Sequence, residues 1–378
     1  MARPVTGQSK IEAIVTVLRE RIADGTYGVG SLLPAERELA EEFGVSRVTV
    51  RTALHRLSEQ RLVRKVPGRG TYVLSRDGQS ALGDVSIGPI ALVCSQLTPS
   101  VASPIGAGCS TAALAHRTQL LLCDTGGSTF AEAQAKELLH LRTLYEQGVR
   151  GVILWWQEGE ASLPWLERFV ADGRAVLFID RYVEIEGADF VGIDDQAAAR
   201  EAVQHLIRLG HERIGCVVHS LRVTTSSGRL EGYRQALREA VIPLKREYEL
   251  LVEEGRADIG VRVADAFLGL SSPPTAVLAV NDYVAIEIIE AMTARGVRVP
   301  EDFAVVSFAD MEVARHYRVP LTTIHQPFRS MGETAVHLIA ERLATGRREP
   351  RKLLLPWALI VRSSCGSRRE PANPAGTP

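Results

Sequence analysis

The sequence lacks any apolar run of the roughly 18–20 residues that a membrane-crossing helix needs. Its amino-terminal stretch MARPVTGQSK also lacks the apolar core of a secretory signal, so we expect a cytoplasmic protein with no membrane partner. Lysine is scarce and occurs only at Lys10, Lys65, Lys136, Lys245 and Lys352. None of them has the context of a Schiff-base lysine, which argues against a catalytic body built around pyridoxal phosphate.

Cysteine is equally rare, and the five cysteines are Cys94, Cys109, Cys123, Cys216 and Cys365. Their number is odd, and their spacing forms neither a CxxC pair nor a set of Cys and His metal ligands. We therefore expect buried thiols in a reducing compartment and no metal site. Nothing in the sequence calls for a cofactor.

The chain has a net charge of only −1, so its charge as a whole indicates no partner. The distribution of charge is uneven, however. Between Ser46 and Gly70 the only acid is Glu59, and the cations are Arg47, Arg51, Arg56, Arg61, Arg64, Lys65 and Arg69. Such a local cationic face favours a polyanion bound by one domain, although a solvated helix face gives the same composition.

Three helical patterns occupy the first 60 residues. Apolar spacing predicts a first helix over about residues 10–24, and Pro34 precedes a second. Gly44 stands where a helix ends, and Ser46 is placed to cap a third helix over about residues 47–60. The inward-facing residues of this third helix should be Val50, Ala53, Leu54 and Leu57. Two helices joined by a short turn that contains glycine predict a helix-turn-helix.

A β-hairpin follows the third helix. The stretch LVRKVPGRGTYVLS, residues 62–75, contains two β-rich runs around a Pro-Gly-Arg-Gly turn, which predicts a wing with a cation at its tip. In a helix-turn-helix the first residues of the second helix reach base edges in the major groove. Arginine there pairs with guanine, and a threonine methyl contacts thymine. This combination favours DNA binding.

Residues 8–75, and above all LPAERELAEEFGVSRVTVRTALHRLSEQRLVRKVPGRGTYV, resemble the winged-helix head of the GntR family of bacterial repressors. The resemblance implies a double-stranded DNA operator as partner. The contacts it implies are Arg37, Ser46, Arg47, Thr49 and Arg51 in the helices and Gly68, Arg69 and Gly70 in the wing. Arg56, Arg61 and Arg64 are expected to be surface or helix-pairing residues.

The remaining sequence predicts an α/β body. Residues 76–88 are small, polar and glycine-rich, which predicts a linker between a DNA-binding domain of residues 1–75 and a body of residues 89–366. Residues 367–378 are expected to form a disordered tail. Nine short apolar runs, from IALVC to AVVSFA, alternate with helical stretches. This pattern is typical of parallel sheets covered on both faces, and so many runs predict two lobes.

Ligands of open parallel sheets lie beyond the carboxyl ends of the strands. The polar or aromatic residues that follow apolar runs include Trp155, Asp180, Arg181, Asn281 and Asp310. Their alternating donors and acceptors suit a polyhydroxylated ligand, and a tryptophan face suits a sugar ring.

Each of these residues has an alternative role. Strand-end Asp and Asn often only cap the next helix, and Asp194 and Asp195 indicate mainly capping. Trp155 and Trp156 are neighbours on a strand and point to opposite faces, so one of them should lie in the core. His211 is expected to be a turn residue.

Residues 87–366 resemble the effector-binding domain of the lac/galactose repressor family, which is similar to periplasmic sugar-binding proteins. The motifs that carry the resemblance include LFIDR, SSGRLEGYRQAL, AVLAVNDYVAIEII and PLTTIHQPF. It implies two Rossmann-like lobes joined by crossing strands, with an effector between them. The positions that match effector contacts are Asp180, Arg181, Arg229, Asn281 and Gln326.

Two positions depart from that family. Ala309 stands where the family has an aspartate, which leaves the acid at Asp310, and Ile259 stands where it often has an aromatic. Ring stacking is therefore assigned to Trp155. A GntR-type head on such a body resembles arabinose-type repressors, which supports carbohydrate sensing.

These observations predict a transcriptional repressor that acts as a homodimer and is controlled by a small carbohydrate-like effector. The first alternative is a GntR-headed enzyme with a pyridoxal-phosphate or other catalytic body. The second is a periplasmic solute receptor, which requires an export signal and leaves the winged helix unexplained.

Overall fold

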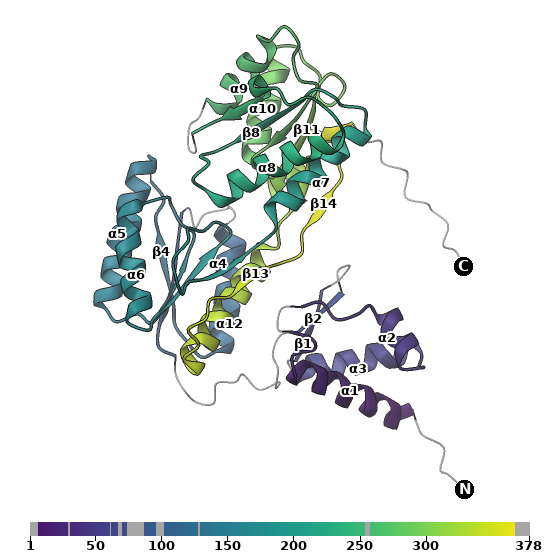
Figure 1. Ribbon diagram of the computed structural model, residues 1–378, viewed down its shortest axis with the longest axis vertical. Helices are drawn as coiled ribbons and strands as arrows, with labels where there is room; N and C mark the ends of the chain where they lie inside the picture. The colour runs from purple at the N-terminus through teal and green to yellow at the C-terminus, as the bar shows by residue number, and fades with distance from the viewer. Residues whose placement is uncertain are drawn as a thin grey trace. The chain divides into compact units, whose positions relative to one another are not determined.

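The computed structural model describes residues 7–28, 31–60, 62–66, 70–73, 87–95, 102–127, 129–253 and 258–366. The chain forms two compact units, one of residues up to Ile87 together with Ala340–Arg347, and one of the residues from Gly88 onward without that stretch. We call the residues up to Ile87 the head and the residues from Gly88 onward the body, and their helices and strands are labelled in Figure 1. Most of the expected linker, residues 76–86, and the expected tail, residues 367–378, lie outside the described residues.

The head consists of three helices and a hairpin. They are α1 (Gly7–Ala23), α2 (Glu36–Glu42), α3 (Arg47–Glu59), β1 (Val63–Val66) and β2 (Gly70–Val73), and the two strands are antiparallel. The apolar stripes meet in one core, in which Leu18, Leu39 and Leu57 are completely buried. Gly44 has a φ of +60°, which a residue with a side chain rarely adopts, and it ends α2. The predicted helices and wing are confirmed, although α2 begins two residues after Pro34.

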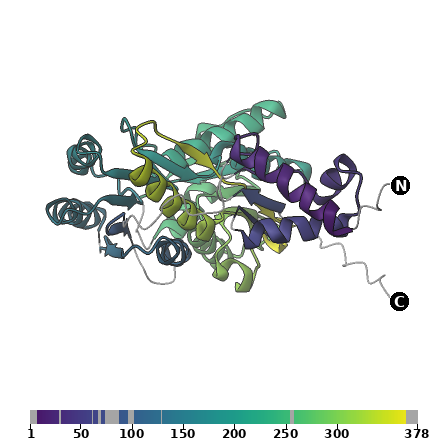
Figure 2. The same cartoon turned by 90° about the horizontal axis from the view of Figure 1, so that it is seen from below.

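Lobe 1 of the body contains a six-stranded parallel sheet of order β13-β7-β6-β5-β3-β4. Its strands are β3 (Ile90–Cys94), β4 (Leu120–Asp124), β5 (Gly151–Leu154), β6 (Ala175–Ile179), β7 (Asp189–Gly192) and β13 (Lys352–Leu354). Its helical segments are α4 (Ala102–Ala115), α5 (Phe130–Glu146), η1 (Glu160–Ser162) and α6 (Leu163–Ala171). Helices lie on both sides of the strands (Figure 2), which is why every residue of β3, β5 and β6 is buried.

Lobe 2 contains a second six-stranded sheet, of order β14-β12-β11-β10-β8-β9. Its strands are β8 (Ile214–Val218), β9 (Glu249–Leu251), β10 (Ala276–Ala279), β11 (Ala304–Ala309), β12 (Thr322–His325) and β14 (Ala358–Ile360), and only β14 pairs antiparallel. Its helical segments are α7 (Asp195–Arg208), α8 (Thr224–Glu239), η2 (Arg246–Tyr248), α9 (Ile259–Leu268), α10 (Asp282–Ala294), α11 (Glu312–His316) and η3 (Ser363–Cys365).

The chain passes between the lobes three times: after β7, after β12 and between β13 and β14. After the second passage α12 (Phe328–Thr345) packs against α4 of lobe 1, where a Cβ on Gly332 would lie 2.2 Å from the carbonyl oxygen of Ile105. The two-lobed prediction is confirmed, and all nine apolar runs are strands. The three further strands, β12 to β14, were not among the nine runs. No helix in the described ranges is long and apolar enough to cross a membrane.

Candidate functional site

The amino-terminal turn of α3 is built by its cap. Ser46 Oγ accepts the N–H of Thr49 at 3.2 Å, and the two hydroxyls lie 2.8 Å apart, as the sequence predicted for this cap. Arg47 is exposed beside them. The helix dipole and the remaining amide groups of this turn favour an anion, so it suits a phosphate or a base edge.

Arg51 lies one turn further along α3 and is held by an acid. Its Nε and Nη2 donate to Glu36 Oε2 at 3.2 and 3.0 Å, and Lys65 of β1 donates to the other oxygen of the same carboxylate. Arg37 makes a looser contact, 3.7 Å from Glu41, and both side chains are exposed. The expected DNA-contacting cations of the helices are thus exposed side chains of α2 and α3.

Gly70 and Val48 are two further exposed residues of the head that bear on its expected DNA contacts. Gly70, expected to contact DNA, is exposed with a φ of +112°, and a Cβ there would lie 2.7 Å from Leu32 Cδ1. Gly68 and Arg69 lie outside the described residues. Val48 was not predicted as a contact, yet its side chain is 69% exposed in the first turn of α3. It lies off the apolar stripe of α3, and an exposed apolar side chain is of the kind that can contact a thymine methyl.

In the body, a chain of buried hydrogen bonds joins the two lobes. Gln326, which follows β12, donates to Asp180 Oδ1 of lobe 1 at 2.9 Å and accepts from Arg229 Nη2 of lobe 2 at 3.4 Å. Arg229 also donates to the carbonyl of Val280 at 2.5 Å and lies over the ring of Phe308. The structure therefore brings together three of the residues that were predicted to bind an effector.

Asp195 completes this chain and corrects a prediction. Asp194 caps α7 as expected, because its Oδ1 accepts the N–H of Ala197. Asp195 is not a cap but accepts from Arg229 Nε at 2.8 Å, with both side chains almost fully buried. Burial raises the pKa of Asp195, and the charge of Arg229 opposes this shift.

Close packing of two helices makes the Arg229–Asp195 pair possible. A Cβ on Gly232 of α8 would lie 2.2 Å from the carbonyl oxygen of Gln196 on α7, so only glycine fits there. Arg229 stands one turn before Gly232, directly opposite Asp195. Sequence spacing alone could not show that two residues 34 positions apart share a buried ion pair.

Trp155 and Arg181 form a second contact in lobe 1. The guanidinium carbon of Arg181 lies 5.0 Å from the centroid of the Trp155 ring, and both residues are buried. Trp156 packs into the core of lobe 1, as expected for one of the two adjacent tryptophans. The indole nitrogen of Trp155 has no hydrogen-bond partner among the described residues, so it is a donor that a ligand can use.

Asn281 caps a helix, which is the alternative role that the sequence allowed for it. Its Oδ1 accepts the N–H of Val284 at 2.9 Å and caps α10. It also directly follows Val280, whose carbonyl accepts from Arg229. An asparagine amide that caps through its oxygen keeps its nitrogen as a donor.

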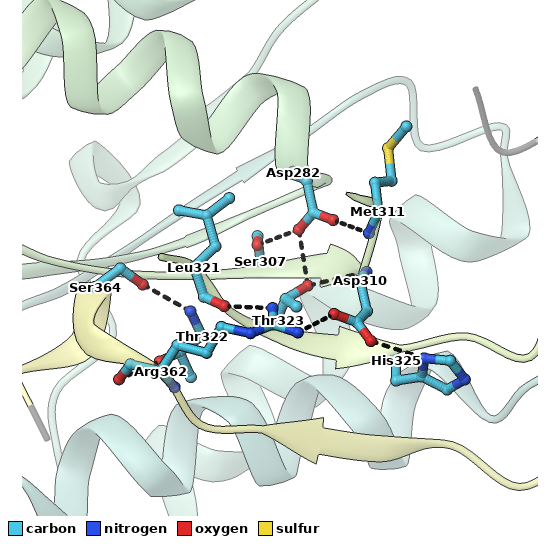
Figure 3. Close-up of polar contacts among 10 residues, drawn as sticks. All are labelled: Asp282, Ser307, Asp310, Met311, Leu321, Thr322, Thr323, His325, Arg362 and Ser364. Atoms are coloured by element: carbon cyan, nitrogen blue, oxygen red, sulfur yellow. Dashed lines mark hydrogen bonds and ion pairs between the residues drawn. The ribbon is translucent and has the colours of Figure 1, made fainter. Parts of the chain in front are cut away.

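Asp310 lies in a different network (Figure 3). Its two carboxylate oxygens accept from Arg362 Nη2 at 2.5 Å and His325 Nδ1 at 2.9 Å. Burial acts to raise the pKa of Asp310, but these bonds and charges outweigh it and leave the pKa below its ordinary value. Within the described residues, Asp310 is not hydrogen-bonded to the Asp180–Gln326–Arg229–Asp195 chain. Its bonds to His325 and Arg362 connect β11 and β12 to the segment after β14.

The same network contains another buried acid, which is linked to Asp310 through Thr323, because the Thr323 hydroxyl accepts the backbone N–H of Asp310. Asp282 accepts from Ser307 Oγ, Thr323 Oγ1 and the backbone N–H of Met311 (Figure 3). Burial raises the pKa of Asp282 to about 6, against the effect of these bonds. Its partners all come from lobe 2, so it organises the strand ends of that lobe.

Glu137 is a further buried acid, on α5 of lobe 1. Its side chain is 0% exposed, and Oε2 accepts the backbone N–H of Gln157 at 2.7 Å. Burial raises its pKa from 4.5 to about 7, opposed by hydrogen bonding and by the charge of Arg181. A carboxyl whose pKa is raised on folding stabilises the protein below its unfolded pKa, and this contribution is lost as the pH rises through the folded pKa.

We therefore expect Glu137→Gln to flatten the dependence of stability on pH. Between pH 5 and pH 8 the free energy of unfolding of the wild type should fall by up to about 3 kcal/mol more than that of the variant, because glutamine keeps the size but does not titrate. Urea unfolding at both pH values measures the difference. Glu132→Gln, an exposed change on the same helix, is the control, and equal pH slopes in wild type and Glu137→Gln would contradict the assignment.

Three further predictions from the sequence concern the cysteines, a metal site and His211. All five cysteines are free and buried, and burial raises the pKa of Cys94 and Cys109 to about 12. Within the described ranges no three His, Cys, Asp or Glu side chains are grouped to hold a metal ion. His211 lies between α7 and β8 with Nδ1 3.0 Å from the Thr275 hydroxyl, as expected of a turn residue.

Comparison with known proteins gives matches for both units. The family model described as bacterial regulatory proteins, gntR family, matches residues 10–73, and the one described as a periplasmic binding protein-like domain matches residues 203–365. The transcriptional regulator DegA of Bacillus subtilis is 31% identical over 252 residues, which cover 65% of this chain and 71% of DegA. The transcriptional repressor PurR of Vibrio atlanticus is 30% identical over 247 residues and covers the same shares.

Solved structures agree with these matches. The complex of the transcriptional regulator CelR with cellobiose has a TM-score of 0.66 at 26% identity and covers 96% of this chain and 100% of that chain. A LacI family transcriptional regulator from Mycobacterium smegmatis has a TM-score of 0.64 at 25% identity and covers 73% of this chain and 98% of that chain. Both resemblances stated from the sequence, and the predicted fold class, are confirmed.

Proposed function

This chain belongs to the LacI family of transcriptional regulators and carries a GntR-family DNA-binding head, and from this premise we propose that a small polyhydroxylated effector controls its affinity for an operator. Its relatives are transcriptional regulators, so the enzymatic alternative is set aside. The prediction of a DNA-binding regulator is confirmed; the effector class, the site residues and the dimer are proposals.

The observation that carries the proposal is the buried chain Asp180–Gln326–Arg229–Asp195. It offers two carboxylates, an amide and a guanidinium, contributed by both lobes and by one of the segments that cross between them. Hydroxyl groups both donate and accept, so a sugar or polyol can bond to both kinds of group at once. The cellobiose bound to the related CelR supports this class of ligand.

The indole of Trp155 and the guanidinium of Arg181 extend the proposed site in lobe 1. Their stacked arrangement offers N–H donors next to an aromatic edge. Asn281 adds a donor from lobe 2. Asp310 was predicted as a contact, but its two oxygens already bond to Arg362 and His325, so we assign it to holding the strand ends beside Gln326.

We also propose that the protein acts as a homodimer. One winged helix makes few base contacts, and two at a fixed spacing reach useful specificity. Each lobe has a strand edge with an exposed leucine, namely Leu122 on β4 at 53% and Leu251 on β9 at 61%. Open apolar edges are places where a second copy can pair.

Effector binding then changes DNA affinity through the lobes. A ligand that bonds to Asp180 and Arg229 stabilises one arrangement of lobe 1 against lobe 2 in each copy. A dimer transmits that difference to the spacing of its two heads, with a coupling free energy that is typically about 1–3 kcal/mol.

The experiment that tests this function has two steps. Selection from a library of random DNA duplexes should give an inverted repeat that binds two copies of the chain, measured by the mass of the complex. A thermal-shift screen of pentoses, hexoses, disaccharides, polyols and sugar phosphates should then identify ligands that raise the melting temperature. A ligand found in this way must change operator affinity. No selected sequence, or a bound ligand without effect on DNA, would refute the proposal.

A further inference from the structure

Glu36 is an acid of the head whose side chain is mostly buried between two cations. It is the first residue of α2, and its side chain is only 15% exposed. Its carboxylate accepts from Arg51 on α3 at 3.0 and 3.2 Å and from Lys65 on β1. One acid therefore contacts a cation from the recognition helix and a cation from the wing.

Charge and geometry give opposite expectations for this acid. Hydrogen bonds from Arg51 and Lys65 lower the pKa of Glu36, so the carboxylate is ionised at neutral pH. A negative charge on a DNA-facing surface weakens the attraction to phosphates, so by charge alone Glu36 opposes binding of any duplex. By geometry it holds the charged ends of Arg51 and Lys65, which are long, flexible side chains whose ends would otherwise be mobile.

The geometry of Arg51 decides between these expectations. The guanidinium uses the edge formed by Nε and Nη2 to bond to Glu36, which fixes its plane. The second edge, formed by Nη1 and Nη2, keeps the two parallel N–H groups that pair with guanine O6 and N7. A guanidinium already held in one plane loses less entropy on binding. The 3.7 Å contact of Arg37 with Glu41, between two exposed side chains, gives no such fixation.

We propose that Glu36 is a positioning residue for operator recognition: it orients Arg51 and Lys65 together, and so increases affinity for the operator although its charge decreases affinity for DNA in general. The inference rests on the proposed DNA contacts of the head. It adds a residue that touches no base and acts through Arg51.

The test compares the full chain with Glu36→Gln on two duplexes, the selected operator and a shuffled sequence of the same composition. Glutamine keeps the size but has no charge, and an NH2 donor replaces one of the two oxygens that accept from Arg51 and Lys65, so operator affinity should fall about tenfold. Affinity for the shuffled duplex should stay constant or rise. Glu59→Gln, which removes an exposed acid that pairs only loosely with His55 of the same helix, is the control and should not lower operator affinity.

A double-mutant cycle with Arg51→Ala separates positioning from a general structural effect. If Glu36 acts through Arg51, adding Glu36→Gln to Arg51→Ala should lower operator affinity by less than about twofold. Unchanged or tighter operator binding by Glu36→Gln overturns the inference, as does an equal loss on both duplexes or in both backgrounds. A wild-type chain that does not distinguish the two duplexes refutes the proposed function instead.

Discussion

Arg229→Met yields a protein that still binds its operator but whose operator affinity no longer responds to effector. Arg229 bonds to Asp195, Val280 and Gln326, so its loss removes the centre of the proposed site. Truncating one partner of a buried, hydrogen-bonded charge pair costs about 2–5 kcal/mol in binding. Effector affinity, measured by calorimetry with a ligand from the screen, should therefore fall at least about 30-fold.

The same substitution should lower stability. Asp195 would be left as a buried carboxyl without its cation, which typically costs about 3–5 kcal/mol of unfolding free energy. The double variant Arg229→Met with Asp195→Leu removes both charges and should recover most of that stability without recovering effector binding. This variant separates loss of the site from loss of the fold.

A matched control exists on the same two helices. Arg200 of α7 pairs with Glu239 of α8 at 3.2 Å, and both side chains are exposed. Exposed pairs contribute about 0–1 kcal/mol, so Arg200→Met should leave stability and effector response nearly unchanged. If Arg229→Met responded to effector with wild-type affinity, the assignment of the site to this buried chain would be wrong.

Arg51→Ala gives the converse result: operator binding is lost while effector binding remains. An arginine that pairs with guanine contributes about 1–3 kcal/mol of discrimination, and a dimer uses two recognition helices, so about 2–6 kcal/mol is at stake. Operator affinity should fall at least about 30-fold. Fluorescence anisotropy with the selected operator measures it, and calorimetry with the ligand measures the effector site.

Arg56→Ala is the control for Arg51→Ala. Arg56 lies on the same helix, where it contacts Glu12 of α1, and we expect it to pair helices rather than to touch DNA. Its loss should change operator affinity by less than about threefold, since a surface pair contributes little. Equal losses from Arg51→Ala and Arg56→Ala would show that only the total charge of the head matters.

Local features of the head could be predicted from the sequence because they depend on neighbours along the chain. The cap at Ser46 needs only a hydroxyl three residues before an amide, and Gly44 needs only the freedom to adopt a positive φ. The alternation of apolar runs and helices in the body likewise required no tertiary information, which is why the nine predicted strands are all present.

The candidate sites could be predicted only in part. Asp180, Arg229 and Gln326 were identified through resemblance, and the structure joins them, but Asp195 was taken for a cap. Asp310 was predicted as an effector contact because it follows a strand, and its bond to Arg362, 52 residues away, gave no signal in the sequence. Glu36 gave no signal, because its two cations come from elements further along the chain.

The sequence by itself determined the periodicities, turns and caps, and through them the winged head and the two-lobed body, since each of these arises from residues a few positions apart. Only the tertiary structure decided which charged side chains pair. A buried charge needs a partner within hydrogen-bond distance, and the close packing of α7 on α8, of β11 beside β12 and of α2 against α3 determines which partner lies at that distance.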